Sequence, residues 1–270
     1  MSVAQNTASG IIKSVLIQLE QRLDIKVLMA AEAGSRAWGF ASPDSDYDVR
    51  FIYCRPVDRY LTVNKRRDVL DINTPELTEV LRDLGIDTDI MDFAGWDADK
   101  AVYQMSKSNP QVLEWTNSPI IYRPNAHLVA LAEKMYNPIP VMHHYRSMAK
   151  GNFREYLQGD EVWYKKYLYV IRPIMAAQFT AKFGTPAPVS FSQLRDAVEP
   201  AKITAAVDAL LEIKMRTGEK KLHPRVPILN EWIEEQLEIL ETIPDQELAI
   251  VSPAVDLDQE FRDILYFNDI

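Results

Sequence analysis

Two short stretches, taken in order, decide the fold: Gly34-Ser35-Arg36-Ala37-Trp38-Gly39, and then Asp44-Ser45-Asp46-Tyr47-Asp48-Val49-Arg50-Phe51-Ile52-Tyr53. The first follows an apolar run, residues 25–31, which is typical of a buried strand. Its glycines predict a turn that opens a short helix. The second stretch passes from acidic into apolar residues and predicts another strand over residues 46–53. This order of strand, turn, short helix and acid-led strand indicates a unit that mixes helix and sheet.

The turn at Gly34 and Ser35 has the chemistry of a phosphate site. Glycine lets the backbone approach a phosphate closely, and the unpaired amides at a helix start favour negative charge. The hydroxyl of Ser35 adds a donor. A Gly-Ser turn between a strand and a helix is nevertheless common in proteins that mix the two, so the turn alone is weak evidence for function.

The acidic residues that follow strengthen the prediction. Asp46 and Asp48 are two apart on the predicted strand and therefore share one face. Two carboxylates together with substrate phosphates are the usual way in which proteins hold Mg²⁺. Asp44 has the same phase, but its place between Pro43 and Ser45 indicates a turn residue rather than a ligand.

A phosphoryl-transfer site with two metals generally needs another carboxylate from a different strand. Residues 87–93 predict such a strand and contain three candidates, Asp87, Asp89 and Asp92. Asp87 and Asp89 share a face, whereas Asp92 falls on the other face unless the strand is bulged or has ended. The period of the strand does not choose among them.

Beyond residue 97 the strand signals nearly vanish and helical periodicity takes over. We therefore expect an α+β protein with a mixed-sheet domain over residues 1–120 and a helical domain over residues 121–270. An earlier helix is expected at residues 10–23, a possible strand at 68–72, and a short helix from Thr74 with Pro75 at its first position. The later helices are expected at residues 98–106, 127–136, 142–157, 163–183, 202–216 and 228–240.

Composition limits the classes of protein to consider. The chain has 39 acidic and 30 basic side chains, a net charge of -9, so any contact with a polynucleotide is expected to be local. Its single cysteine, Cys54, cannot close an intramolecular disulfide and is expected in the core. The sequence shows neither a long apolar run nor the pattern of a secretory signal at its start, so no membrane contact and a cytoplasmic location are expected.

Several basic residues leave two interpretations open. Arg36 can contact phosphate from the turn or pair with Asp44. Lys165, Lys166 and Arg172 share one predicted helix, and Arg172, just before Pro173, can contact a nucleotide phosphate or form a buried ion pair. The most basic stretch can be a local RNA site, but a solvated loop after a helix end is favoured. That stretch comprises Lys214, Arg216, Lys220, Lys221, His223 and Arg225.

The two opening stretches also resemble a known family. Gly-Ser, about ten residues, then Asp-x-Asp on a strand is similar to the signature of the DNA polymerase beta-like nucleotidyltransferase superfamily. More narrowly, residues 34–40 with residues 42–50 resemble its RNA-repair-pathway family of nucleotidyltransferases. Three later parts of the sequence look like that family too. They are Gly95-Trp96-Asp97 with residues 108–115 and Ser118-Pro119, Lys166-Tyr167-Leu168-Tyr169-Val170-Ile171-Arg172-Pro173, and Leu210-Leu211-Glu212-Ile213-Lys214.

The resemblance implies a small mixed sheet with flanking helices and a metal-dependent reaction. It implies that a hydroxyl attacks the α-phosphate of an NTP and releases pyrophosphate, with Mg²⁺ or Mn²⁺ as cofactor. By the same resemblance, Gly34 and Ser35 hold the triphosphate and Asp46 and Asp48 hold metal. In the family the third acid precedes a Gly-Trp-Asp stretch, which favours Asp92 over Asp89 as metal ligand and base.

The sequence leaves open which molecule accepts the NMP and whether the protein catalyses the transfer. An RNA end is the acceptor that the family name suggests, and a protein hydroxyl is the enzymatic alternative because the chain is acidic. A module that binds nucleotide without transferring it, of an antitoxin-like kind, is the rival from another class.

Overall fold

The computed structural model describes residues 3–64, 66–198, 200–217, 221–245, 248 and 254–267. Five strands form one mixed sheet in the order β3-β4-β2-β1-β5. Only β2 and β4 run parallel, and the other neighbours are antiparallel. The bounds are β1 (Lys26–Glu32), β2 (Tyr47–Cys54), β3 (Val69–Leu70), β4 (Met91–Asp97) and β5 (Ile121–Arg123). The α+β class that the sequence predicts is confirmed.

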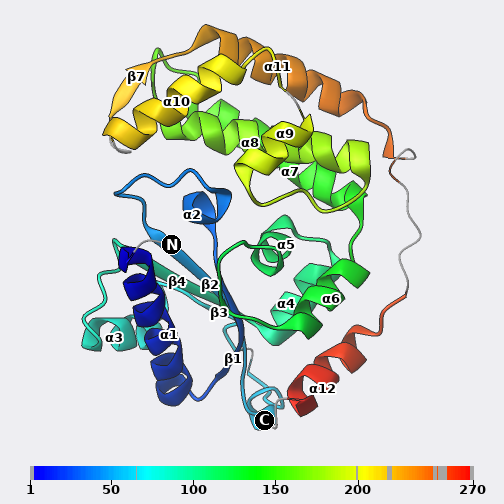
Figure 1. The fold of residues 1–270 in the computed structure, drawn as a ribbon. Coiled ribbons are helices and arrows are strands. Elements are labelled where there is room, and N and C mark those ends of the chain that lie inside the picture. Colours follow the sequence, from blue (N-terminus) through cyan, green and yellow to red (C-terminus); the bar gives the residue numbers. More distant parts are fainter. Residues whose placement is uncertain are drawn as a thin grey trace.

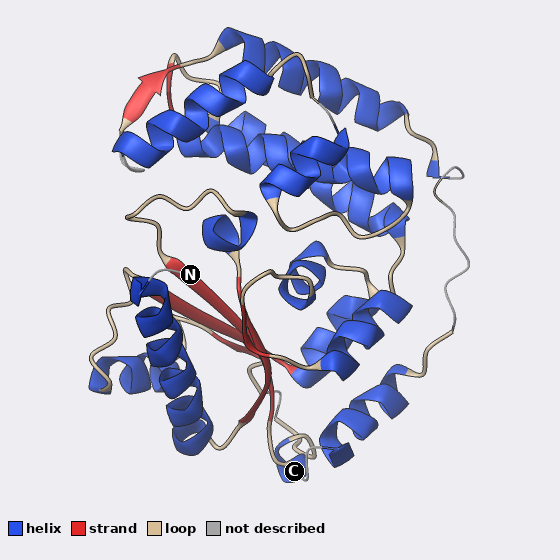
Figure 2. Cartoon of the chain, viewed as in Figure 1, coloured by secondary structure: helices blue, strands red, loops and turns tan. Residues whose placement is uncertain are grey.

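Helices cover both faces of the sheet, and a further helical layer lies beside it (Figure 1). In Figure 2 the five-stranded sheet lies in one half of the molecule, and the other half is helical except for one short pair of strands. The helices near the sheet are α1 (Val3–Leu23), α2 (Gly34–Trp38), α3 (Pro75–Asp83), α4 (Ala98–Ser106), α5 (Pro110–Thr116), α6 (Ala126–Lys134) and α12 (Leu257–Phe267). The helical layer comprises α7 (Pro138–Tyr156), α8 (Tyr164–Phe183), α9 (Phe191–Val198), α10 (Thr204–Thr217) and α11 (Pro227–Thr242).

The period of β2 assigns its side chains to two cores. Val49, Phe51 and Tyr53 are buried against α1 and α3. Ile52 and Cys54 are buried on the opposite face, in the core that continues into the helical layer. Asp48 has the phase of Ile52 and therefore faces that second side.

Strand β4 begins later than the predicted strand at residues 87–93, and this changes the positions of Asp87 and Asp89. Residues 87–90 form a turn, and β4 begins only at Met91. The Asp87 carboxylate accepts the amide of Asp89 at 3.0 Å, and its carbonyl accepts the amides of Ile90 and Met91. Aspartate favours such turns because its side chain bonds the backbone two residues on. The expectation that Asp87 and Asp89 share a face of a strand was therefore wrong.

Several short elements had no expected counterpart. Helix α5 begins after Asn109, whose side chain accepts the amide of Gln111 at 2.9 Å. The helical region also contains a two-stranded antiparallel sheet, β6 (Glu161–Trp163) with β7 (Leu222–Pro224). Helix α12 packs back against α4 near the sheet, where Phe261 meets the ring of Tyr60 at 5.0 Å. Such short segments carry too few turns to show a period.

The expected division of the chain after residue 120 stays a proposal. Strand β5 lies just beyond that point and pairs with β1 through Ala30 and Ala31. We therefore propose that the sheet domain extends to Arg123 and that the helical domain follows.

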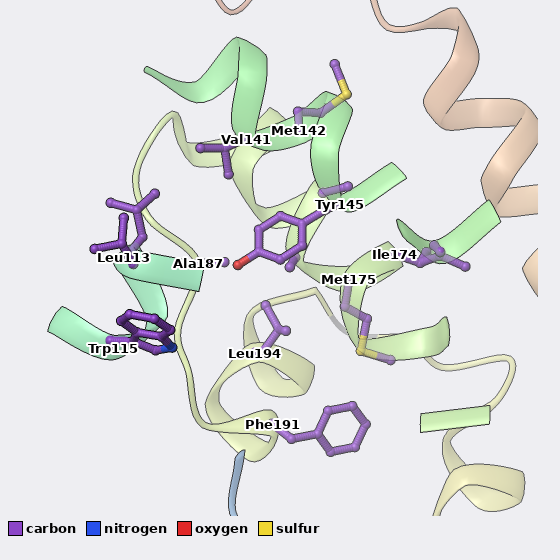
Figure 3. Packing of buried hydrophobic residues seen from close by; sticks show 14 of the residues in the cluster. Leu113, Trp115, Val141, Met142, Tyr145, Ile174, Met175, Ala187, Phe191 and Leu194 are labelled. Carbon is purple, nitrogen blue, oxygen red and sulfur yellow. The ribbon is translucent and has the colours of Figure 1, made fainter. Parts of the chain in front are cut away.

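The two regions share one core. Buried side chains of α5, α7, α8 and α9 converge there (Figure 3). The ring of Tyr145 extends from α7 toward the helix that carries Leu113 and Trp115 (Figure 3). This continuous packing fixes α8 beside the sheet, on the face to which Asp48 belongs.

Helix α8 contains Pro173 and still continues. Proline removes the donor that would bond the carbonyl of Tyr169, four residues earlier. The side chain of Asn152 from α7 donates to that carbonyl at 3.1 Å. A neighbouring helix thus replaces the lost bond, and Arg172 keeps a helical position deep in the protein.

Within the described ranges, we find no helix that combines the length and the apolar character needed to cross a membrane.

Candidate functional site

The Gly34 turn lies directly against the side chain of Asp48. Gly34 has φ +58°, and a Cβ atom there would come within 2.0 Å of Oδ2 of Asp48. Only glycine adopts this conformation freely and leaves room for the carboxylate. Ser35 follows as a buried residue of α2, which ends at Gly39 with φ +86°. The turn and the acid strand, separate in the sequence, form one surface.

Asp48 and Asp92 are direct partners in the parallel pairing of β2 with β4. One guanidinium nitrogen of Arg50, Nη2, contacts both carboxylates, Oδ1 of Asp48 at 2.9 Å and Oδ2 of Asp92 at 2.8 Å. The two side chains therefore point to the same place on the same face of the sheet. Of the candidates Asp87, Asp89 and Asp92, the structure therefore brings Asp92 beside Asp48.

The other predicted acids, Asp46 and Asp89, lie just before the strands that carry this pair. Asp46 is exposed and lies just before β2 begins. Asp89 is exposed in the turn that precedes β4. The structure thus groups Asp48 with Asp92 and places Asp89 outside the strand.

The chemistry of the pair suits a hard divalent cation. Both groups offer carboxylate oxygens, the donors that Mg²⁺ prefers, and both already converge on a single cationic nitrogen. In the part of the chain that the structure describes, no three His, Cys, Asp or Glu side chains are grouped so as to hold a metal by themselves. Since Mg²⁺ usually takes one or two carboxylates plus substrate phosphates, two protein ligands fit it.

Arg36 holds the loop that leads from the turn to the acid strand. Its Nε donates to the carbonyl of Asp46 at 2.9 Å and its Nη2 to that of Ser45 at 2.5 Å. The guanidinium also lies 3.8 Å from the centre of the Tyr47 ring. These contacts tie α2 to the start of β2.

A buried acid that the sequence motifs do not single out, Glu32, lies beneath the site. Its Oε1 accepts the backbone amide of Asp48 at 2.7 Å, and its Oε2 accepts the hydroxyl of Tyr122. Burial raises the pKa of Glu32 to about 7, although both hydrogen bonds act in the opposite direction. Glu32 therefore fixes the backbone that carries Asp48. The signal in the sequence was a single acid at the end of an apolar strand, two residues before Gly34.

A cleft of about 320 Å³ opens beside Asp48. The sheet side contributes Gly34, Asp48 and Arg50 to its walls, and α8 contributes Tyr169 and Arg172. The cleft therefore lies between the sheet and the helical layer. Its volume is at the lower end of the range for small-molecule sites.

Arg172 forms the buried ion pair that was one of its two interpretations. Its Nη1 contacts Glu114 at 2.7 Å, and its side chain is only 3% exposed. The other oxygen of Glu114 accepts the indole N–H of Trp38 at 3.1 Å, and Tyr145 donates to the first. Nε of Arg172 is buried without a hydrogen-bond partner. Glu114 thus joins α2, α5, α7 and α8 around one wall of the cleft.

Lys166 reaches the cleft only through a neighbour. Its ammonium lies 3.6 Å from the centre of the Tyr156 ring and 5.6 Å from that of Tyr169, which lines the cleft. The contact with Tyr156 keeps the charge beside helix α7.

The favoured reading of the basic stretch as a solvated loop was wrong for its first member. Lys214 is buried at the end of α10, and its Nζ donates to the carbonyl of Phe40 at 3.0 Å. It also lies 3.4 Å from the hydroxyls of Ser42 and Ser45. A lysine of the helical region therefore holds the loop between the turn and the acid strand. Lys220 of the same stretch lies outside the described residues.

Comparison with known proteins agrees with this geometry. A family model described as "RNA repair pathway DNA polymerase beta family" matches residues 9–263. The chain is also 39% identical over 228 residues to "Uncharacterized protein YcgL" of Bacillus subtilis (strain 168), and the alignment covers 83% of each chain. The resemblance that the motifs suggested is confirmed over most of the length. The chain belongs to the RNA repair pathway DNA polymerase beta family.

Proposed function

We propose that this protein is a metal-dependent nucleotidyltransferase, which moves NMP from an NTP to a hydroxyl acceptor and releases pyrophosphate. The observation that carries the proposal is the contact between the Gly34 turn and Asp48 in the wall of a cleft, with Asp92 as the strand partner of Asp48. A turn that binds phosphate and acids that would hold a metal are expected to lie close together, because such a metal would supply positive charge to the same phosphates. Membership of a polymerase beta family supports the same reaction.

The residues have distinct proposed roles. Gly34 and Ser35 bind the triphosphate, and Asp48 and Asp92 hold Mg²⁺ or Mn²⁺ with Asp46 as a further ligand. When bound, the metal would neutralise charge on the phosphates and lower the pKa of the attacking hydroxyl. Asp92 is our preferred base, in place of Asp89, because β4 places it beside Asp48.

The cationic side chains have supporting roles in this proposal. Arg50 balances the charges of Asp48 and Asp92 when no metal is bound, and the metal would replace that contact. Arg36 keeps the turn and the acid strand together and stays a candidate contact for phosphate. Arg172 and Lys166 are proposed on the side of α8, where the sugar and base would lie near Tyr169.

A pool of RNA with hydroxyl ends and a pool of cell protein distinguish the two acceptors. Each pool is incubated with the protein, Mg²⁺ or Mn²⁺, and each α-labelled NTP in turn. We expect label in the RNA pool, which the family's pathway favours, whereas label in protein alone would identify nucleotidylation of a partner. Label transfer that survives the double substitution Asp46→Ala, Asp48→Ala would contradict the mechanism.

A non-catalytic nucleotide-binding module is the second candidate. The observation in its favour is that the described residues do not group three metal-binding side chains. This candidate predicts that an NTP binds with Mg²⁺, that binding weakens when the acids are removed, and that no label is transferred to either pool.

A further inference from the structure

A second cavity, of about 650 Å³, lies at the other end of the sheet from the candidate active site. Asp48 is at the start of β2 and Arg55 comes directly after its end, roughly 20 Å away at the rise of an extended strand. Five arginines line the cavity: Arg22, Arg55, Arg59, Arg66 and Arg67. We call it the arginine cavity.

The arginine cavity is rich in positive charge although the chain as a whole is acidic. The whole chain carries a net charge of -9, yet only two acidic residues, Asp24 and Glu76, line the arginine cavity together with the five arginines. A cavity wall of one predominant charge concentrates ions of the opposite charge. The expected ligand is therefore an anion.

A buried carboxylate holds two of the arginines in fixed positions. Asp97 is fully buried and contacts Nε of Arg55 at 3.2 Å and Nε of Arg66 at 3.4 Å. The hydroxyl of Tyr60 donates to Asp97 at 2.6 Å, and the Arg66 guanidinium lies 4.1 Å from the centre of the Tyr60 ring. Both guanidinium groups are thus oriented before any ligand arrives, which lowers the entropy lost on binding.

The other three arginines pair with carboxylates near the surface. Arg22 contacts Asp83 at 2.6 Å, Arg67 contacts Asp71 at 2.8 Å, and Arg59 lies 3.8 Å from Asp24. A guanidinium has five N–H donors. The contacts use one donor of Arg22 and three of Arg67, whose Nε and Nη1 also donate to the carbonyls of Val69 and Asn73, so donors remain on each. Ion pairs at the surface are weak, so a multiply charged anion can add to or replace them.

The first turn of α3 also borders the arginine cavity, at Thr74, Pro75 and Glu76. The hydroxyl of Thr74 accepts the amide of Asp71 at 3.0 Å and makes no hydrogen bond that caps α3. The first amides of a helix favour a phosphate oxygen. This helix start adds to the arginines and does not define the site alone.

We propose that the arginine cavity binds a compact polyphosphate group, such as the phosphates of a nucleotide. Guanidinium groups pair with phosphate oxygens in a bidentate manner, and five of them around one space suit a ligand with several adjacent phosphates. The volume is sufficient for a nucleotide. This site lies apart from Asp48 and Asp92, and its occupation requires no transfer reaction.

Calorimetric titration of the full chain with inorganic tripolyphosphate, without divalent metal, tests the proposal. The double variant Arg59→Ala, Arg67→Ala removes two exposed guanidinium groups, whose side chains are 61% and 48% exposed. We expect it to bind tripolyphosphate at least about 10-fold more weakly at the affected site, because a charge-assisted hydrogen bond contributes about that factor. The variant Arg59→Lys, Arg67→Lys keeps the charge but loses the two-pronged N–H geometry of the guanidinium, so an intermediate loss of affinity is expected.

The matched control is Arg154→Ala, Arg216→Ala, which removes the same charge from exposed positions of α7 and α10. Its affinity should stay within about twofold of the wild type, and urea unfolding should show similar midpoints for all variants. Equal losses in the control and the Arg59, Arg67 variant, or no loss in the latter, would overturn the proposal.

A single-stranded RNA of twelve nucleotides with hydroxyl ends separates adjacent phosphates from a chain of phosphodiesters. We expect RNA to compete weakly with tripolyphosphate at this site. If only the RNA responds to the loss of Arg59 and Arg67, the cavity is a polynucleotide site and the proposal is wrong.

Discussion

Asp48 and Asp92 are register partners on the parallel strands β2 and β4, and their carboxylates meet on one nitrogen of Arg50. The parallel pairing brings two acids that are far apart in the sequence onto one acidic surface. The Gly34 turn lies against the same carboxylate of Asp48. Each of these relationships predicts the effect of a substitution.

The first prediction compares Asp92 with Asp89. Asp92→Asn should lower the rate of NMP transfer at least about 100-fold. A bound metal would stabilise the transition state by several kcal/mol, and each 1.36 kcal/mol of activation free energy changes the rate tenfold. Asp89→Asn should change the rate less than about threefold, since Asp89 is exposed in the turn before β4. The measurement is the initial rate of NMP transfer with saturating NTP. An equal loss of rate in both variants would indicate that Asp89 also takes part in the reaction.

The second prediction concerns Gly34, with Gly39 as its control. Both have positive φ, so alanine at either position carries a backbone cost of about 1–2 kcal/mol. Gly34→Ala must in addition displace Asp48, whereas the space at Gly39 is open within 4 Å. We expect only Gly34→Ala to abolish NTP binding in a calorimetric titration, with both free energies of unfolding reduced. Normal NTP binding by the Gly34→Ala variant would show that the Gly34 turn is not part of the NTP-binding site.

The third prediction addresses Lys214. Replacing it by methionine leaves the buried carbonyl of Phe40 without its donor, at a cost of about 1–3 kcal/mol. The loop from Phe40 to Ser45 should then loosen, which raises KM for NTP more than it lowers kcat. Arg216→Met, on the same helix but exposed, is the control and should be close to wild type. Urea unfolding and steady-state kinetics measure the two effects.

The fourth prediction concerns the ion pair of Arg172 with Glu114. Arg172→Met removes the ion-pair partner of the partly buried Glu114 carboxylate, which keeps its hydrogen bonds from Trp38 and Tyr145, and should destabilise the protein by about 2–3 kcal/mol. The double variant Arg172→Met, Glu114→Gln should recover part of that loss, since no charge then remains buried. A double-mutant cycle of unfolding free energies gives the coupling, and simple additivity of the two losses would contradict a direct pair.

The fifth prediction is a pH dependence of stability that arises from Glu32. Burial raises its pKa from 4.5 to about 7, so between these values the folded state binds more protons than the unfolded state. The contribution of Glu32 to stability therefore falls as pH rises through this window, by on the order of 3 kcal/mol in total. Below pH 4.5 the side chain is protonated in both states and the effect vanishes.

Glu32→Gln checks this sign. Glutamine can still accept the amide of Asp48 but does not titrate, so the difference in unfolding free energy between variant and wild type should grow in favour of the variant from pH 4.5 to 7. The measurement is urea unfolding of metal-free protein across that range. A constant difference would show that Glu32 has an ordinary pKa in the folded state.

The sequence by itself determined the local parts of this protein. Apolar runs broken by glycine predicted β1, α2 and β2 nearly at their observed bounds. These features depend on neighbouring residues, and a local pattern therefore records them. The Gly-Ser and Asp-x-Asp motifs likewise pointed to the family that the comparisons confirm.

Tertiary structure alone decided which distant residues join them. The family resemblance already favoured Asp92 over Asp89, but the place of Asp92 beside Asp48 follows from the register of β2 with β4, and strand periodicity carries no information on register between strands. The contacts of Glu32, of Lys214 and of the five arginines of the arginine cavity follow only from the tertiary structure. Lys214 lies 174 residues from Phe40, and no local period relates positions so far apart. The sequence predicted the chemistry of the turn and the acids, and packing between distant segments decided which side chains surround them.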